Sequence, residues 1–283
     1  MDGGRGDGWA LVVPVRGGTL GKSRLALPNR DRLADAFARD TVAALRAGMP
    51  SALVLVVTSD PDVAGWAGRA GCAVVADPGT GLDSAGAVGT SAALTDPRVS
   101  WVAVVLADHP ALRADELPRV AAALGGVTSG FVPDADGTGT AVLVTSRAGT
   151  YRSAFGPGSA ARHQALGHPR LDLDLPGLRT DVDDTDSLAA ALALGVGPRT
   201  TLALAAATGS LVTVQATIYA MEAGEGSALL DDGLEVEVPA EALIGSGLRF
   251  LRPGQRVSIE LDESGTRATR VWIVGIGNGE VVG

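Results

Sequence analysis

The stretch ALVVPVRGGTLGKSRL, residues 10–25, sets the expectation for the fold. Its first part, Ala10–Val15, is apolar and rich in valine, which predicts a short buried strand. The glycine-rich part that follows, Gly17–Arg24, carries the cations Lys22 and Arg24. Because glycines let backbone N–H groups turn toward an anion, a strand followed by such a loop predicts a phosphate-binding site at the end of that strand.

Lys22 is the only lysine among the 23 lysine and arginine residues of the chain. Lysine presents a compact point charge and arginine a planar fork, so a tight phosphate loop is a reason to keep a lysine. The spacing is not the GxxxxGK[ST] of a P-loop, and the alternative interpretation is an ordinary surface turn with solvated charges. We interpret Lys22 and Arg24 as candidates that neutralise phosphate charge.

The composition limits the classes of function. A length of 283 residues suggests one large domain or two smaller ones, and a hydrophobic fraction of 46% is enough to form a sizeable core. The formal net charge of -9 argues against general nucleic-acid binding. A single cysteine, Cys72, excludes an intrachain disulfide and a cysteine-based zinc site. No apolar run is long enough to span a bilayer, and the N-terminus lacks the pattern of a secretory signal, so we expect a cytoplasmic protein.

From Ala10 onward, apolar runs alternate with segments of helical periodicity. The predicted strands are Ala10–Val15, Leu53–Val57, Cys72–Ala76, Val102–Leu106 and Thr140–Val144, and the predicted helices are Arg32–Ala47, Pro61–Ala70, Ser84–Leu94, Ala114–Leu124 and Thr185–Leu194. This alternation predicts an α/β domain over residues 9–205 with a mostly parallel, Rossmann-like sheet. Ligands of such sheets bind beyond the carboxyl ends of the strands, so residues just after each strand are the functional candidates.

After the mixed segment Gly195–Ser210, the pattern changes to short strands separated by turns. The predicted strands are Leu211–Ala220, Ala228–Leu230, Leu234–Val238, Arg256–Leu261 and Ala268–Val274, and they predict a small all-β barrel over residues 211–276. The segments SGLRFLRPGQRV, residues 246–257, and RATRV, residues 267–271, resemble a cold-shock-like OB fold. The base-stacking aromatics of that fold are missing and its face is acidic, which favours packing, dimerisation or regulation over nucleic-acid binding.

Three aspartates are candidate metal ligands. Asp108 ends an apolar strand in LADHPAL, residues 106–112, where a carboxylate can hold Mg²⁺ against a triphosphate. Asp181 and Asp183 are alternate residues of an extended segment, so their side chains share a face and could complete that site. The alternative is that Asp108 caps a turn or a helix, and that the acidic run caps the helix beginning at Thr185.

A second candidate anion site is FGPGSAARH, residues 155–163. Glycines, the hydroxyl of Ser159 and the basic pair Arg162 and His163 stand at a predicted helix start. Thr140 and its neighbours, at the start of the preceding strand, are expected to face this segment. The alternative is a glycine- and proline-rich connection in which Ser159 is only the helix N-cap.

Five segments together carry a family resemblance. PVRGGTLGKSRL, LADHPAL, DGTGTAVL, FGPGSAARH and DVDDTDSL resemble the guanylyltransferases of coenzyme F-420 biosynthesis, which join GTP to phosphoenolpyruvate or 2-phospho-L-lactate. The resemblance covers residues 9–205, and FGPGSAARH is its most discriminating segment because the wider nucleotidyltransferase superfamily does not generally share it. It implies a GT-A-like nucleotidyltransferase fold, Mg²⁺ as cofactor, GTP and a small phosphorylated carboxylic acid as partners, and release of pyrophosphate.

The resemblance also implies a role for individual residues. The nucleotide side comprises Arg16, Gly17, Gly18, Lys22 and, in the base-side segment PGTGLD, Gly79, Gly81 and Asp83. The resemblance implies Thr140, Gly156 and Ser159 as acceptor residues, and Asp108 and Asp181 as metal ligands with Asp183 close by. From the residues themselves we add Arg162 and His163 to the acceptor site, and we predict Lys22, Arg24 and Asp108 as the catalytic residues. Two positions depart from the family pattern, since asparagine is more usual at Asp83 and lysine is common at Arg16.

The inventory of side chains fits transfer of a nucleotidyl group. The acceptor phosphate is already ionised near pH 7 and needs no strong general base, and the sequence offers no convincing Ser–His–Asp or Cys–His set. Three alternatives stay open: a molybdenum-cofactor guanylyltransferase, a glycosyltransferase with Asp181-Val182-Asp183 as its DxD metal motif, and a non-enzymatic nucleotide- or nucleic-acid-binding regulator. We expect no membrane partner and no general nucleic-acid binding, and the chain is open to forming a homo-oligomer.

Overall fold

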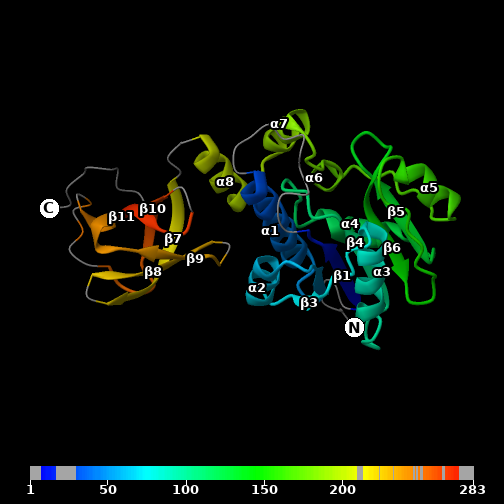
Figure 1. The fold of residues 1–283 in the computed structure, drawn as a ribbon, viewed down its shortest axis with the longest axis horizontal. Helices are drawn as coiled ribbons and strands as arrows, with labels where there is room; N and C mark the ends of the chain where they lie inside the picture. Colours follow the sequence, from blue (N-terminus) through cyan, green and yellow to red (C-terminus); the bar gives the residue numbers. More distant parts are fainter. Residues whose placement is uncertain are drawn as a thin grey trace. The chain divides into compact units, whose positions relative to one another are not determined.

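The structure, a computed structural model, describes residues 8–16, 30–208, 213–222, 224–231, 233–244, 246, 248, 251–262 and 265–273. The chain divides into two compact units, Met1–Thr200 and Thr201–Gly283, whose elements are labelled in Figure 1. The division lies in helix α8, Pro198–Thr208, inside the segment for which the sequence predicts a mixed linker. Alanine and leucine favour a helix there, and Asp40 accepts the N–H groups of Arg199 and Thr200 at 3.1 and 2.8 Å, which caps its first turn.

A six-stranded sheet forms the centre of the first unit. Its strands, in order across the sheet, are β3 Ala73–Val75, β2 Leu53–Val57, β1 Trp9–Pro14, β4 Trp101–Val105, β6 Thr140–Ser146 and β5 Ser129–Pro133. Strands β3, β2, β1 and β4 pair in parallel, and β6 runs antiparallel to both of its neighbours. The predicted mostly parallel α/β sheet is confirmed, and the carboxyl ends of β1 and β4 lie next to each other, where ligands of such sheets bind.

Helices cover both faces of this sheet (Figure 1). They are α1 Arg30–Gly48, α2 Pro61–Arg69, α3 Leu82–Ala93, α4 Glu116–Ala123, α5 Ser159–Ala165, α6 Pro176–Arg179 and α7 Thr185–Leu194. The alternation of β1 separates two cores, because Leu11 and Val13 pack with residues of α1, α2 and α4 whereas Ala10 and Val12 pack with residues of α3. In the part of the chain that the structure describes, no helix is long and apolar enough to cross a membrane.

Strand β5 and helix α6 are not among the predicted elements. The sequence of β5, SGFVP, contains a glycine and a proline, which weaken a strand pattern. The structure completes this edge strand from a distant segment, since the Phe131 N–H donates to the Pro169 carbonyl oxygen at 3.0 Å and the Leu171 N–H donates to the Phe131 carbonyl oxygen at 2.8 Å. Contacts far along the chain therefore decide an element that the local pattern does not specify.

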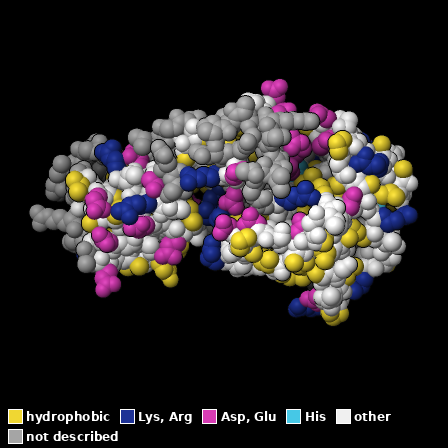
Figure 2. Space-filling model, viewed as in Figure 1, with side chains coloured by type: hydrophobic (Ala, Val, Ile, Leu, Met, Phe, Trp, Pro, Cys, Tyr) yellow, Lys and Arg dark blue, Asp and Glu magenta, His cyan; other side chains and the backbone are white. Residues whose placement is uncertain are grey.

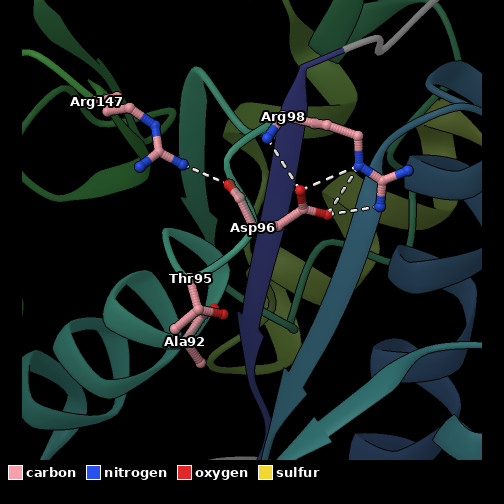
Figure 3. A network of polar contacts seen from close by, with 5 residues as sticks. All are labelled: Ala92, Thr95, Asp96, Arg98 and Arg147. Atoms are coloured by element: carbon pink, nitrogen blue, oxygen red, sulfur yellow. Dashed lines mark hydrogen bonds and ion pairs between the residues drawn. The ribbon is translucent and has the colours of Figure 1, made fainter.

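Two arginines, Arg147 and Arg98, hold the connection between α3 and β4. Arg147, which follows β6, donates from Nε to the Val99 carbonyl oxygen at 2.6 Å, from Nη1 to the Leu94 carbonyl oxygen at 3.1 Å, and from Nη2 to the Asp96 carbonyl oxygen. The Asp96 side chain lies on the other side of the same turn, where Arg98 binds it and lowers its pKa to about 2 (Figure 3). The turn is thus fixed through its carbonyl groups as well as its side chains.

The second unit contains a five-stranded antiparallel sheet. Its strands, in order across the sheet, are β11 Ala268–Ile273, β10 Arg256–Leu261, β7 Thr213–Glu222, β8 Glu225–Leu230 and β9 Glu235–Val238, and the 3-10 helix η1, Ala240–Leu243, follows β9. All five predicted strands are present, and alternate residues such as Val257 and Ile259 form the core. On the face of this unit that Figure 2 shows, acidic side chains are interspersed with basic ones.

Candidate functional site

Asp108, Asp181 and Asp183 lie together beyond the carboxyl end of β4. Each offers a carboxylate oxygen, and these three oxygens lie within 4.8 Å of one another. The Val182 N–H donates to the Asp108 carbonyl oxygen at 3.0 Å, which holds the segment of Asp181 and Asp183 against the end of β4. Val182 is fully buried between its two neighbours, so the two aspartates project away from it together, as their alternation predicts.

The negative charges of this acidic cluster repel one another. Burial, followed by the charges of Asp108 and Asp183, raises the pKa of Asp181 to about 7 from its ordinary 3.8. A divalent cation would relieve this repulsion, and carboxylate oxygens are the ligands that a hard cation such as Mg²⁺ prefers. The cluster therefore fits a divalent metal ion. The adjacent Asp184 has a different role, because its carboxylate accepts the Ser187 N–H at 2.9 Å and caps α7.

Asp181 is positioned by the short helix α6, which ends just before it. The Gly177 N–H in α6 donates to Glu116 Oε1 at 2.8 Å, and the other carboxylate oxygen of Glu116 accepts the Arg113 N–H at 2.8 Å. Glu116 is buried, and a Cβ on Gly177 would lie 2.2 Å from the Ala111 carbonyl oxygen, so only glycine fits there. The sequence does not single out Glu116, because a glutamate in the first turn of a helix is commonly explained by its favourable interaction with the helix dipole alone.

The loop that leads into Thr140 is ordered by Asp134. The side-chain carboxylate of Asp134 accepts the Thr138 N–H at 2.9 Å. The backbone carbonyl oxygen of Asp134 accepts a hydrogen bond from the Arg179 guanidinium at 2.9 Å. The charge of Asp134 also contributes to raising the pKa of Asp181. The loop before Thr140 and the segment that carries Asp181 are thus tied together through one residue, another that the sequence does not single out.

The hydroxyl groups of Thr140 and Ser159 meet at the start of α5. Ser159 Oγ donates to Thr140 Oγ1 at 3.1 Å, and both residues are buried. The preceding loop turns through Gly156 and Gly158, whose φ angles of 105° and 71° favour glycine, and the Ser159 N–H donates to the Gly156 carbonyl oxygen at 3.0 Å. The structure therefore brings together Thr140, Gly156 and Ser159, three of the residues that the sequence predicts to bind the acceptor.

Arg162 and His163 contact the backbone of this loop. The Arg162 guanidinium donates to the carbonyl oxygens of Ala154 and Phe155 at 2.9 and 3.0 Å. His163 is fully buried, and its Nε2 accepts the Ala154 N–H at 2.9 Å, so the proton of the neutral ring lies on Nδ1, which donates to Thr140 Oγ1 at 2.8 Å. Both side chains thus support the loop, and the contact of Arg162 and His163 with the acceptor stays a prediction.

We expect His163 to make the stability of the first unit dependent on pH. Burial, the largest cause, lowers the pKa of His163 to about 4 from its ordinary 6.5. Between these values the unfolded chain binds the proton on this side chain and the folded protein does not, so the contribution of His163 to the free energy of unfolding falls by about 3 kcal/mol as the pH decreases through this window. Urea unfolding at about pH 7 and pH 4.5 measures the loss, with His163→Gln as the comparison. An equal loss of stability in both proteins would contradict the assignment to His163.

The residues predicted for the nucleotide lie only partly in the described chain. Gly17, Gly18, Lys22 and Arg24 lie outside the described residues. Arg16 follows β1 and is exposed. Gly79 and Gly81 of the base-side segment have φ angles of 77° and 122° before α3. Asp83, in the first turn of α3, accepts the Phe155 N–H at 2.9 Å and so contacts the acceptor side of the site.

Comparisons with known proteins identify a family model and relatives that this chain resembles. Residues 19–170 match the family model described as the MobA-like NTP transferase domain. The chain is 45% identical over 201 residues to a phosphoenolpyruvate guanylyltransferase of Salinispora arenicola, covering 69% of this chain and 92% of that protein. It is 46% identical over 198 residues to a phosphoenolpyruvate guanylyltransferase of Streptomyces coelicolor, covering 68% of this chain and 93% of that protein. Both relatives are thus matched almost throughout, although about a third of this chain lies outside the matches.

Proposed function

Since the chain belongs to the family of phosphoenolpyruvate guanylyltransferases and has a MobA-like NTP transferase domain, we propose that it transfers the guanylyl group of GTP to phosphoenolpyruvate and releases pyrophosphate. The chain is therefore a nucleotidyltransferase. Its product would enter coenzyme F-420 biosynthesis, and 2-phospho-L-lactate is the alternative acceptor for the same chemistry. The observation that carries the proposal is the cluster of Asp108, Asp181 and Asp183, which lies where ligands of this sheet bind.

The proposed reaction is an in-line displacement at phosphorus. An oxygen of the acceptor phosphate forms a bond to the α-phosphorus of GTP while the bond from that phosphorus to the bridging oxygen of pyrophosphate breaks. The attacking oxygen is already anionic, so no base has to remove a proton from it. The protein therefore has to align the two phosphates and neutralise the charge that gathers between them.

Each part of the proposed site supplies one of these needs. Asp108, Asp181 and Asp183 are proposed to hold Mg²⁺, which supplies positive charge opposite the triphosphate when bound. The hydroxyls of Thr140 and Ser159 and the backbone of Gly156 are proposed to bind the acceptor through hydrogen bonds to its anionic oxygens. The residues proposed for GTP are Arg16, Gly17, Gly18, Lys22, Arg24, Gly79 and Gly81.

One assay tests the proposed function directly. Purified full-length protein is incubated with Mg²⁺ and GTP and with phosphoenolpyruvate, 2-phospho-L-lactate or 3-phosphoglycerate, and the release of pyrophosphate is measured. We expect release with phosphoenolpyruvate, and a higher kcat/KM with 2-phospho-L-lactate would assign the alternative acceptor. Absence of release with all three acids would contradict the proposed function, and replacement of GTP by ATP tests the base.

We propose that the second unit is an OB-like barrel. The strand order β11-β10-β7-β8-β9 is compatible with that fold. Edge strand β9 is joined to the residues just before β11 by a parallel bridge between Glu237 and Arg267, where the Glu237 N–H donates to the Thr266 carbonyl oxygen at 2.8 Å. This contact supports closure of the sheet into a barrel. The mixture of acidic and basic side chains in Figure 2 supports a role in packing or regulation over nucleic-acid binding.

A chain that ends after Ala205 is expected to keep guanylyltransferase activity, with kcat within about threefold of the full chain. The reason is that the curated relatives are matched over nearly their whole length by about two thirds of this chain. The truncation retains Arg199 and Thr200, whose N–H groups bind Asp40, so the end of the first unit keeps its contacts. Pyrophosphate release by the two proteins measures the effect. A folded truncated protein without activity would show that the second unit takes part in catalysis.

A further inference from the structure

Asp83 connects the base-side segment to the loop proposed to bind the acceptor. It stands in the first turn of α3, two residues after Gly81, and its Oδ1 accepts the Phe155 N–H at 2.9 Å across 72 residues of sequence. Phe155 is the residue before Gly156, where the acceptor loop begins to turn. A hydrogen bond to a carboxylate is among the stronger ones in proteins, so this contact fixes the entrance of the loop.

A second contact one helical turn later supports the same arrangement. Gly86 of α3 faces Tyr151, and a Cβ at this position would lie 2.2 Å from the Tyr151 hydroxyl oxygen. Tyr151 and Phe155 both pack against the core that α3 shares with the sheet. Residues 151–155 therefore lie along the first two turns of α3, and a displacement of this helix start would be passed on to the loop.

Helix α5, which follows the acceptor loop in sequence, holds the other side of this loop. His163 accepts the Ala154 N–H, and Arg162 donates to the carbonyl oxygens of Ala154 and Phe155. These two residues belong to α5, whereas Asp83 is the last residue of the base-side segment and lies in the first turn of α3. The acceptor loop is thus clamped between α5 and α3, and Asp83 supplies the hydrogen bond from the α3 side.

We infer that Asp83 is a positioning residue for the acceptor, which holds the Phe155–Ser159 loop in place through the Phe155 N–H. This inference rests on the proposed function and deepens it, because the sequence resemblance places Asp83 on the nucleotide side only. Since Asp83 ends the base-side segment and also lies in the first turn of α3, the two proposed substrate sites share the start of this helix.

Steady-state kinetics of two Asp83 variants test this role. Asp83→Ala removes the acceptor of the hydrogen bond and is expected to raise the KM for phosphoenolpyruvate by about tenfold or more, while the KM for GTP changes by less than about threefold. Asp83→Asn keeps an oxygen that accepts the Phe155 N–H and is expected to restore the KM for phosphoenolpyruvate to near the wild-type value. An increase confined to the KM for GTP, or an Asn variant as impaired as the Ala variant, would overturn the inference.

Amide hydrogen exchange gives a readout that does not depend on turnover. In the unliganded full-length protein, Asp83→Ala is expected to speed exchange of the Phe155 amide, and Asp83→Asn is expected to keep its protection. Asp77→Ala is the matched control, because it removes another aspartate that accepts a backbone N–H, that of Gly79 at 2.9 Å. This control is expected to leave exchange of the Phe155 amide unchanged. Unchanged exchange at Phe155 in Asp83→Ala would refute the positioning role even if the wild-type protein released no pyrophosphate, a result that by itself would refute only the proposed function.

Discussion

Asp181→Asn is expected to lower kcat about a thousandfold without unfolding the protein. Carboxylate oxygens of Asp181, Asp108 and Asp183 lie within 4.8 Å of one another. Burial, followed by repulsion from the other two carboxylates, raises the pKa of Asp181 to about 7. Asparagine has nearly the same size but removes one negative charge, so the cluster would hold a divalent cation more weakly. The same loss of charge relieves the repulsion, so the metal-free variant should be at least as resistant to unfolding as the wild-type protein.

The opposite signs of these two effects make the test specific. Pyrophosphate release is measured across a titration of Mg²⁺, and thermal unfolding is measured in the presence of a chelator. Asp186→Asn is the matched control, because Asp186 is an exposed residue in the first turn of α7 outside the cluster and should leave both quantities unchanged. If Asp181→Asn kept more than about a tenth of the wild-type kcat at every Mg²⁺ concentration, the acidic cluster would not be the metal centre.

The acidic cluster could be predicted from the sequence because its signals are local. Ala10–Val15 reads as a buried strand and forms β1, Trp9–Pro14, with a shift of one residue. Asp108 stands out because it directly follows a buried strand, where ligands of parallel sheets bind. Asp181 and Asp183 stand out because alternate residues of an extended segment share a face. The strand pattern, the position just after a strand and the alternation of side chains can all be recognised from neighbouring residues. Recognising them requires no information about contacts far along the chain.

The residues that support the site could not be predicted in this way, because their partners lie far along the chain. Glu116 holds Gly177 across 61 residues, and Asp83 holds Phe155 across 72. In the sequence, Glu116 is one of several acidic residues at helix starts and Asp83 follows a glycine turn. Neither pattern indicates which backbone N–H group the carboxylate binds. The contacts of His163 could not be predicted either, since its place in a glycine-rich motif does not show that it is buried and accepts the Ala154 N–H.

Lys22→Ala is expected to lower kcat/KM for GTP about a hundredfold, and Lys22→Arg about tenfold. Lys22 lies outside the described residues, so this prediction rests on the sequence. It is the only lysine in a chain that otherwise uses arginine, and it stands in a glycine-rich loop after the strand β1. In the proposed phosphate site a compact ammonium would neutralise phosphate charge, whereas the wider guanidinium fork would compete with backbone N–H groups for the same phosphate oxygens.

The arginine variant separates a functional lysine from an accident of composition, because it keeps the positive charge. If Lys22 only contributes charge to the surroundings of GTP, Lys22→Arg should match the wild-type kcat/KM, and this result would contradict a specific phosphate contact. If the ammonium itself binds the phosphate, both variants lose kcat/KM and the arginine restores only part of it. Arg32→Ala, which removes an exposed cation from the first turn of α1, is the control for general electrostatics and should change kcat/KM by less than about twofold.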